Sequence, residues 1–323
     1  MFWNVRGLGR AHRRGLVLKH VIQENLDIVG IQKTIKQEFS DQEFKDMSGI
    51  VDFVWKWIPA KGHSGGLLLG VKMESFEIEQ VELAGYFLGC LVRNRLTNFR
   101  FWVLNVYGPA QHELSEEFIL ELSNFCTSEA LPMVLGGDFN LIRSNKDRNQ
   151  GQGDLKLMLL FNNFIGSFHL REIFVSGVKF TWSNKQKNPT LVKLDCILAT
   201  TSWDLNYSHS FAWSKARVGS DHSPLIIDTR EQGASRPKYI FFEEKWIHHE
   251  GFYDLLKTKW GEFKCGSVNT PYSLDVWHGC LQSLRHYLRG WSLRISGENK
   301  ETKKNIAIRF EEIDIIAEKK IVK

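Results

Sequence analysis

Polar residues that can hold a metal ion or move a proton stand at the ends of several apolar runs in this sequence. Asp138 and Asn140 follow the run PMVLGG. In an extended chain, residues two apart point to the same side, with Phe139 on the other. A carboxylate and an amide on one face can position a metal-bound water or a phosphate. For this fragment alone, the alternative is a turn in which the Asp138 side chain caps the end of a strand.

An adjacent Asp221–His222 pair precedes the apolar run PLIID, and Asp195 lies inside the apolar run VKLDCIL. A histidine where a strand begins is more often structural, but an Asp-His pair there can bind phosphate, tune the imidazole and contact a metal. A buried carboxylate is costly unless it is paired. Asp195 therefore requires a partner, such as a histidine N–H or a backbone turn.

Three further apolar segments contain residues that can bind phosphate or a cation. Asn4 stands in WNVRG, Lys33 lies near the end of IVGIQKT, and Tyr107 lies in LNVYGP. Each has an ordinary interpretation by itself. Asn4 can begin a turn, Lys33 can be a solvated charge at a sheet edge, and Tyr107 can pack its ring beside a Gly-Pro turn.

The polar residues are informative as a set, because together they supply what hydrolysis requires. Asp138, Asp221 and Asn4 offer oxygen ligands for a hard cation. Asp195 can orient His222 as a proton carrier. The set lacks a second unambiguous carboxylate for the metal.

These residues must be positioned by strands and helices that the sequence also predicts. Short apolar runs rich in β-branched and aromatic residues indicate strands at 28–32, 53–58, 65–72, 87–92, 100–107, 132–137, 192–198 and 224–228. Helical spacing indicates helices over about 10–25, 113–126 and 155–168. Alternation in the run 100–107 places Phe101, Val103 and Asn105 on one face and Trp102, Leu104 and Val106 on the other. Interleaved strands and helices predict two packed sheets flanked by helices.

The pattern changes after about residue 236, where helical spacing replaces strand signals. Between 300 and 322, the residues Ile306, Phe310, Ile313, Ala317 and Ile321 step by three or four positions, which predicts an amphipathic helix. We expect a boundary near Arg236–Pro237, with one domain over 1–230 and a helical segment over 231–323.

The composition is that of a globular protein. The 323 residues are 43% hydrophobic and 24% charged. No run approaches the roughly 18 apolar residues of a membrane span, and the first residues lack an apolar signal region. We therefore expect a nuclear or cytoplasmic protein that is not secreted and does not enter a membrane.

Five cysteines without a C-x-x-C pair favour free thiols over a zinc site. A net charge of +5 permits a polyanionic partner without requiring one.

Seven short motifs occur in the order WNVRGLG, IVGIQKT, LNVYGP, LGGDFN, FTWSN, KLDCIL and SDHSPL. In wording and order, this set resembles the endonuclease/exonuclease/phosphatase superfamily, and most closely the apurinic-endonuclease-like domain of plant LINE-type (non-LTR) retrotransposons. The resemblance covers about residues 1–230. It implies an α/β fold, a four-layer α/β sandwich of the deoxyribonuclease I-like type followed by a helical C-terminal extension. It also implies Mg²⁺-dependent hydrolysis of a phosphodiester, with Mn²⁺ as a possible substitute, that nicks DNA and leaves a 3′-hydroxyl.

The segment 231–323 resembles the linker that leads to the reverse transcriptase in these polyproteins. The polymerase itself is absent from the sequence, so the resemblance implies a truncated product. The oligomeric state and the DNA target sequence are left open by the sequence.

The resemblance also implies a catalytic role for five residues. Tyr107 contacts the scissile phosphate. Asp138 activates or positions the attacking water, and Asn140 helps to orient it. His222 binds the phosphate or exchanges a proton with it, and Asp195 fixes the tautomer of His222.

A second group of residues is implied to bind metal or DNA. Asn4 and Asp221 belong to the metal site, and Trp182 and Asn184 of FTWSN lie in a loop that faces DNA. At the position of the principal metal carboxylate, however, the family has Q-E-T and this sequence has Lys33. An ammonium group removes an oxygen ligand and places a like charge beside the cation, so the resemblance implies an impaired enzyme.

Two alternatives compete with a retrotransposon-derived DNA endonuclease. The first is a catalytically dead relic that keeps the fold and binds nucleic acid non-specifically through its phosphates. The second is another substrate of the same superfamily, such as a phosphoinositide, a sphingolipid or a poly(A) tail.

Overall fold

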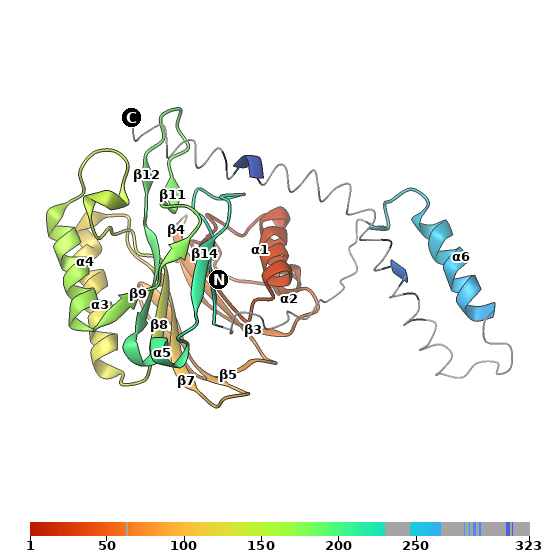
Figure 1. Ribbon diagram of the computed structural model, residues 1–323, viewed down its shortest axis with the longest axis horizontal. Helices are drawn as coiled ribbons and strands as arrows, with labels where there is room; N and C mark the ends of the chain where they lie inside the picture. The colour runs from red at the N-terminus through yellow and green to blue at the C-terminus, as the bar shows by residue number, and fades with distance from the viewer. Residues whose placement is uncertain are drawn as a thin grey trace. The chain divides into compact units, whose positions relative to one another are not determined.

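The structure is a computed structural model (Figure 1). It describes residues 1–62, 64–229 and 246–265, together with residues 281, 284, 287, 288, 291, 308–310 and 312. One compact unit contains residues 1–229, and a second contains the described residues between 246 and 291. Each unit is described by itself.

A seven-stranded mixed sheet, sheet I, has the strand order β10-β14-β15-β1-β2-β4-β3. Its strands are β1 (Phe2–Asn4), β2 (Ile28–Gln32), β3 (Phe53–Lys61), β4 (Ser64–Lys72), β10 (Val175–Ser176), β14 (Phe211–Ser214) and β15 (Leu225–Asp228). Helices α1 (Ala11–Glu24) and α2 (Asp41–Ser48) cover its outer face. Val17, Val21 and Met47 from these helices pack against Trp3 and Ile31 of the sheet.

A six-stranded sheet, sheet II, has the order β5-β6-β7-β8-β13-β9. Its strands are β5 (Phe76–Leu83), β6 (Phe87–Asn94), β7 (Arg100–Tyr107), β8 (Met133–Asp138), β9 (Leu170–Glu172) and β13 (Asp195–Thr200). Helices α3 (Ser115–Ser128) and α4 (Leu155–Ser167) cover its outer face. The short elements are β11 (Trp182–Ser183), β12 (Leu191–Val192), α5 (Thr201–Asn206) and the 3-10 turns His112–Leu114 and Asn145–Asp147.

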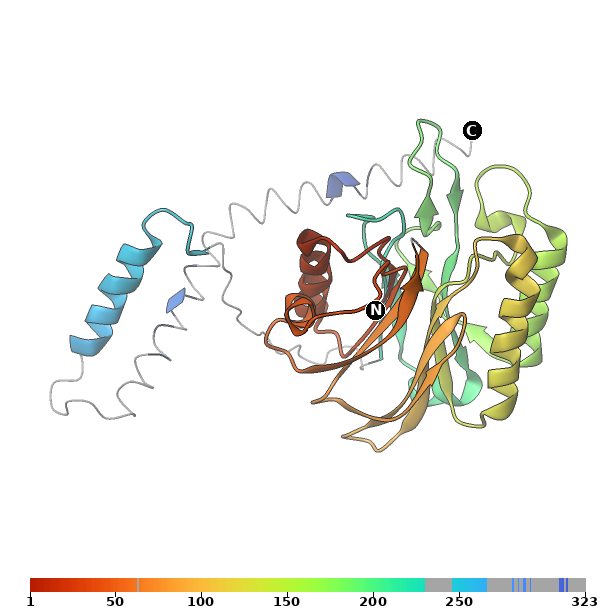
Figure 2. The same ribbon diagram turned by 180° about the vertical axis from the view of Figure 1, so that it is seen from behind.

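The inner faces of the two sheets pack on each other, so the unit has four layers: helices, sheet I, sheet II and helices (Figure 2). Phe101 and Val103 of β7 face the layer between the sheets, whereas Trp102 and Leu104 face α3 and α4. Both faces of β7 are therefore buried, which explains why its sequence is apolar nearly throughout. The predicted four-layer α/β sandwich is confirmed.

The predicted helices over 10–25, 113–126 and 155–168 correspond to α1, α3 and α4. The predicted strand 192–198 is wrong in its bounds, because β12 ends at Val192 and β13 begins at Asp195. Between them the backbone leaves the sheet: the Lys193 N–H donates to the Asp147 carbonyl. Asp195 therefore opens a strand and does not lie in the middle of one.

Strand β5 and helix α2 are among the elements that were not predicted. Strand β5 is an edge strand with its last five residues exposed, and a register shift between Ile78 and Gln80 interrupts its alternation of apolar and polar residues. Helix α2 is short and polar, although Ser40 and Glu43 form a capping box at its start. That capping box is the signal from which the helix could have been found.

In the second unit, helix α6 (Phe252–Cys265) contributes Phe252 to a small apolar cluster with Trp246, Leu288 and Trp291. Most of the predicted helix over 300–322 lies outside the described residues. None of the described helices has both the length and the apolar character that crossing a membrane requires. Cys90, Cys126 and Cys196 are buried free thiols.

Candidate active site

The ends of six strands meet at one rim of the sandwich. β1 and β2 are parallel neighbours, as are β7 and β8, so their carboxyl ends lie on the same side within each pair. β15 runs antiparallel to β1, and β13 runs antiparallel to β8, so these two strands begin where the others end. A hydrogen bond of 2.8 Å from Asn4 Nδ2, at the end of β1, to Asp138 Oδ2, at the end of β8, joins the two sheets at this rim.

Asn105 holds the two sheets in register just below the rim. Its side-chain amide donates to the carbonyls of Ile31 and Leu68 at 3.0 and 3.1 Å, and its carbonyl accepts from the Gln32 side chain. Gly30 makes room for this side chain, since a Cβ there would lie 2.9 Å from Asn105 Oδ1. Asn105 is fully buried and acts as a polar tie between the sheets.

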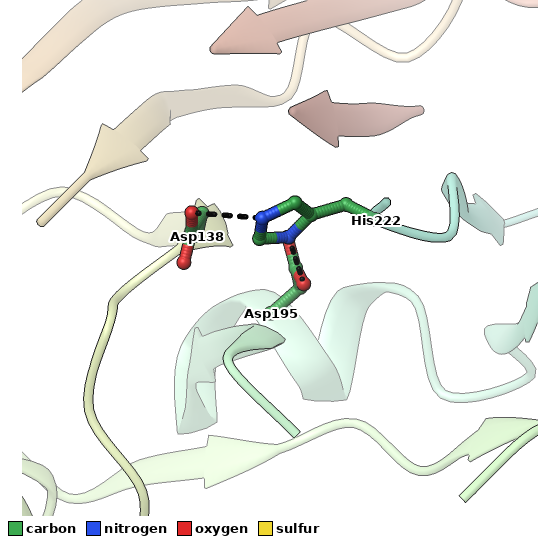
Figure 3. Close-up of side chains that lie close together, drawn as sticks. All are labelled: Asp138, Asp195 and His222. Atoms are coloured by element: carbon green, nitrogen blue, oxygen red, sulfur yellow. Dashed lines mark hydrogen bonds and ion pairs between the residues drawn. The ribbon is translucent and has the colours of Figure 1, made fainter. Parts of the chain in front are cut away.

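His222 lies between two carboxylates (Figure 3). Its Nδ1 is 2.9 Å from Asp195 Oδ2, and its Nε2 is 3.6 Å from Asp138 Oδ2. All three side chains are buried. The partner that the sequence required for Asp195 is therefore the imidazole of His222, which reaches it from a segment that immediately precedes β15.

Burial and charge act in opposite directions on this group. Burial disfavours the imidazolium, but the carboxylates of Asp195 and Asp138 outweigh it and raise the pKa of His222 to about 9. Burial and the charge of Asp195 raise the pKa of Asp138 to about 6, although His222 opposes this. At neutral pH the structure therefore holds a protonated imidazole between two carboxylates.

Asn140 departs from the predicted geometry. β8 ends at Asp138, and Asn140 has a left-handed backbone with φ of 51°, so the two residues do not form an extended pair. The Asn140 N–H donates to Asp138 Oδ1 at 3.0 Å, which is the turn that the alternative interpretation described. Phe139 is buried on the opposite side among the residues beneath α3 and α4, as predicted. Asn140 nevertheless belongs to the candidate site, because it forms this turn and also lines the cavity described next.

A cavity of about 510 Å³ opens at the rim. Nine of the ten predicted site residues line it: Asn4, Lys33, Tyr107, Asp138, Asn140, Trp182, Asn184, Asp221 and His222. The tenth, Asp195, lies behind His222 and contacts it. The structure thus gathers the predicted set at a single place, from segments that span more than 200 residues of the sequence.

Arg6 is a cavity residue that the sequence analysis missed. Its Nη1 is 2.6 Å from Asp221 Oδ2, and the Trp182 indole N–H donates to the same oxygen at 2.8 Å. Burial raises the pKa of Asp221, but His222, Trp182 and Arg6 together hold that pKa below its usual range. The available signal was the position of Arg6, two residues after Asn4 in WNVRG.

The donors of the cavity do not fit a tightly held divalent cation. Asp138, Asp195 and His222 offer ligand atoms within 4.8 Å of one another, but these atoms already face each other, and a histidine ligates a metal only when it is neutral. On the other side of the cavity, the carboxylate of Asp221 is paired with Arg6, and Lys33 stands where the family resemblance predicts a glutamate. Each of these three carboxylates already has a partner, and a hard cation prefers several free oxygen ligands.

No protein-family model matches the chain, and no curated protein gives a match. Several solved structures do match the chain. The 3′ phosphatase NExo from Neisseria, bound to a product DNA hairpin, is 16% identical with a TM-score of 0.56 and covers 70% of this chain and 97% of its own. The endonuclease domain of TRAS1, a telomere-specific non-LTR retrotransposon, is 13% identical with a TM-score of 0.53, covering 70% and 94%. AP endonuclease LMAP from Leishmania major is 16% identical with a TM-score of 0.53, covering 69% and 85%.

The chain has the endonuclease/exonuclease/phosphatase fold. At these identities the likeness shows the fold alone, and any activity depends on the side chains at the rim. The predicted deoxyribonuclease I-like sandwich is confirmed by the same likeness.

Proposed function

We propose that this chain is a phosphodiester hydrolase that nicks DNA and that Lys33 has weakened its activity. The observation that carries the proposal is the meeting of Asp138, Asn140, Tyr107 and His222 in one cavity, with Asp195 behind the imidazole. Similar solved structures support DNA as the substrate class, because they include an AP endonuclease, a retrotransposon endonuclease and a phosphatase bound to product DNA.

The residues of the cavity divide the chemistry among them. Asp138, with a pKa near 6, is ionised at neutral pH and accepts a proton from water as the water oxygen attacks phosphorus. The bond from phosphorus to the 3′-oxygen breaks, and the 3′-oxygen takes up a proton from solvent water. His222 donates a hydrogen bond to a phosphate oxygen, and Asp195 keeps the imidazole oriented for this donation. Burial and the charge of Asp138 raise the pKa of Tyr107, so its phenol stays protonated and also donates to the phosphate.

Nicking is expected to depend weakly on divalent metal in this chain. Mg²⁺ is the ion that the family resemblance implies, with Mn²⁺ as the alternative. Lys33 and the Arg6–Asp221 pair leave such an ion few ligands. In a Lys33→Glu variant, the restored carboxylate would face the cavity and supply an oxygen ligand.

A supercoiled-plasmid nicking assay tests the proposal. We expect Lys33→Glu to nick about 10- to 100-fold faster than the natural chain in Mg²⁺, the range by which partners of metal ligands alter activity. Lys45→Glu is the matched control, because it makes the same change in charge at an exposed position of α2. Asp138→Asn, introduced into the Lys33→Glu variant, should abolish the nicking. Equal rates for the natural chain and Lys33→Glu would contradict the proposed impairment, and no nicking by either would contradict the hydrolase.

We also infer that the chain derives from a plant LINE-type retrotransposon polyprotein that works in the nucleus or cytoplasm. In this interpretation, residues 1–230 are the nuclease domain and residues 231–323 are the linker toward a reverse transcriptase. The likeness to the TRAS1 endonuclease domain supports a retrotransposon origin, and the motif order in the sequence supports the plant branch.

A further inference from the structure

Three cationic side chains, Arg6, Lys33 and Arg148, line the cavity at the rim. Arg6 is paired with Asp221, and the guanidinium of Arg148 donates to the carbonyls of Gln150 and Gln152. The ammonium of Lys33 forms neither a hydrogen bond nor an ion pair with the described part of the chain. A cation without a counter-ion that lines a cavity creates a site for an anion.

The backbone holds Arg6 and Lys33 on two segments that run side by side. The Val5 N–H donates to the Gln32 carbonyl at 3.2 Å, and the Gly7 N–H donates to the Lys33 carbonyl at 2.8 Å. Both Arg6 and Lys33 have left-handed backbones, with φ of 53° and 55°. Side chains larger than glycine seldom adopt this conformation, and where it persists it is held by its surroundings. These two cations are thus presented by a fixed scaffold and not by a free loop.

Asp221 orients Arg6 without enclosing it. The carboxylate contacts one guanidinium nitrogen, Nη1, and half of the Arg6 side chain, 51%, is exposed. Asp221 is itself held by the Trp182 indole N–H at 2.8 Å. The remaining N–H groups of a guanidinium held in this way can bind two oxygens of one phosphate, whereas a lysine binds as a point charge.

We propose that Arg6 and Lys33 bind a backbone phosphate of nucleic acid without a divalent metal, so that built-in cations neutralise the phosphate. This inference rests on the proposed function for its substrate class, and it follows from the poor fit of the cavity to a metal. It concerns binding alone. Hydrolysis can be slow while binding is retained, because a fixed ammonium cannot coordinate and activate water as a metal does.

Binding of a fluorescein-labelled short DNA duplex, followed by fluorescence anisotropy over a range of salt concentrations, tests the proposal. We expect the natural chain to bind equally well in EDTA and in Mg²⁺. Lys33→Met should weaken binding about 5- to 10-fold at low salt. It should also reduce the slope of log K against log salt by about 1, the change for one lost phosphate contact. Lys45→Met, which removes an exposed charge from α2, should leave that slope unchanged.

Additional variants and controls distinguish a loss of phosphate binding from a loss of folding. Lys33→Gln repeats it with a polar side chain, and thermal melts of each variant show that the fold is intact. Binding that requires Mg²⁺, or a Lys33→Met slope equal to that of the natural chain, would overturn the proposal. Unlabelled DNA should compete far better than inorganic phosphate at equal phosphate concentration, and equal competition would overturn the assignment to nucleic acid. Because these readouts need no cleavage, they separate this inference from the proposed hydrolase, which the plasmid assay tests.

Discussion

Replacing Asp195 by Asn removes one charge from the buried contact with His222 and keeps the size of the side chain. Asp195 Oδ2 lies 2.9 Å from His222 Nδ1, and both side chains are at least 95% buried. With an effective dielectric constant of 20, two unit charges about 4 Å apart interact by roughly 4 kcal/mol. Since one pKa unit corresponds to about 1.36 kcal/mol, removing this attraction should lower the pKa of His222 by about two to three units.

The pKa of His222 should therefore fall from about 9 in the natural chain to near 6 or 7 in Asp195→Asn, an estimate that follows from the same charge interaction. Titration of the imidazole C–H signal by NMR measures both values, and His222→Asn identifies the signal by its disappearance. The control is Asp41→Asn, a change at an exposed residue at the start of α2, which should leave the titration unaltered. If His222 titrates within about half a pKa unit in the natural chain and Asp195→Asn, the charge interaction does not set its protonation state.

Two predictions concern stability. The raised pKa of His222 stabilises the fold fully below its unfolded pKa of about 6.5, and this contribution is lost as the pH rises through about 9. The free energy of unfolding should thus decline between these pH values by at most about 3 kcal/mol more in the natural chain than in His222→Asn, as denaturant titrations at each pH would show. Asn105→Ala breaks the tie between the sheets and leaves the buried amide of Gln32 without its partner, which should cost about 2 to 4 kcal/mol in guanidinium unfolding. Asn163→Ala, at an exposed position of α4, should lower the free energy of unfolding by less than about 0.5 kcal/mol. If the two variants lose equal free energy of unfolding, the hydrogen bonds of Asn105 between the sheets do not stabilise the fold.

The layers of the sandwich were predictable because they follow from local periodicity. In β7, alternation alone assigned Phe101 and Val103 to one face and Trp102 and Leu104 to the other, and each face packs on a different layer. The same reasoning did not identify β5, because a register shift between Ile78 and Gln80 breaks its alternation into two short pieces.

Most residues of the candidate site were predictable, although Arg6 was not, and the contacts among them were not predictable. The cost of burying a lone carboxylate required a partner for Asp195 in any fold that buries it. The left-handed backbone of Asn140 was not predictable, since a single residue in a turn leaves no periodic pattern in the sequence.

By itself, the sequence determined which residue types would stand at strand ends and that Lys33 brings a positive charge to the position of an expected carboxylate. The tertiary structure alone decided that Arg6 pairs with Asp221, a residue 215 positions away, and that the Lys33 ammonium has no counter-ion in the described part of the chain. The physical reason is the separation along the chain of the residues that interact. Hydrophobic periodicity acts between neighbours along the chain, whereas an ion pair depends on strand order and register, which bring distant segments within a few ångströms.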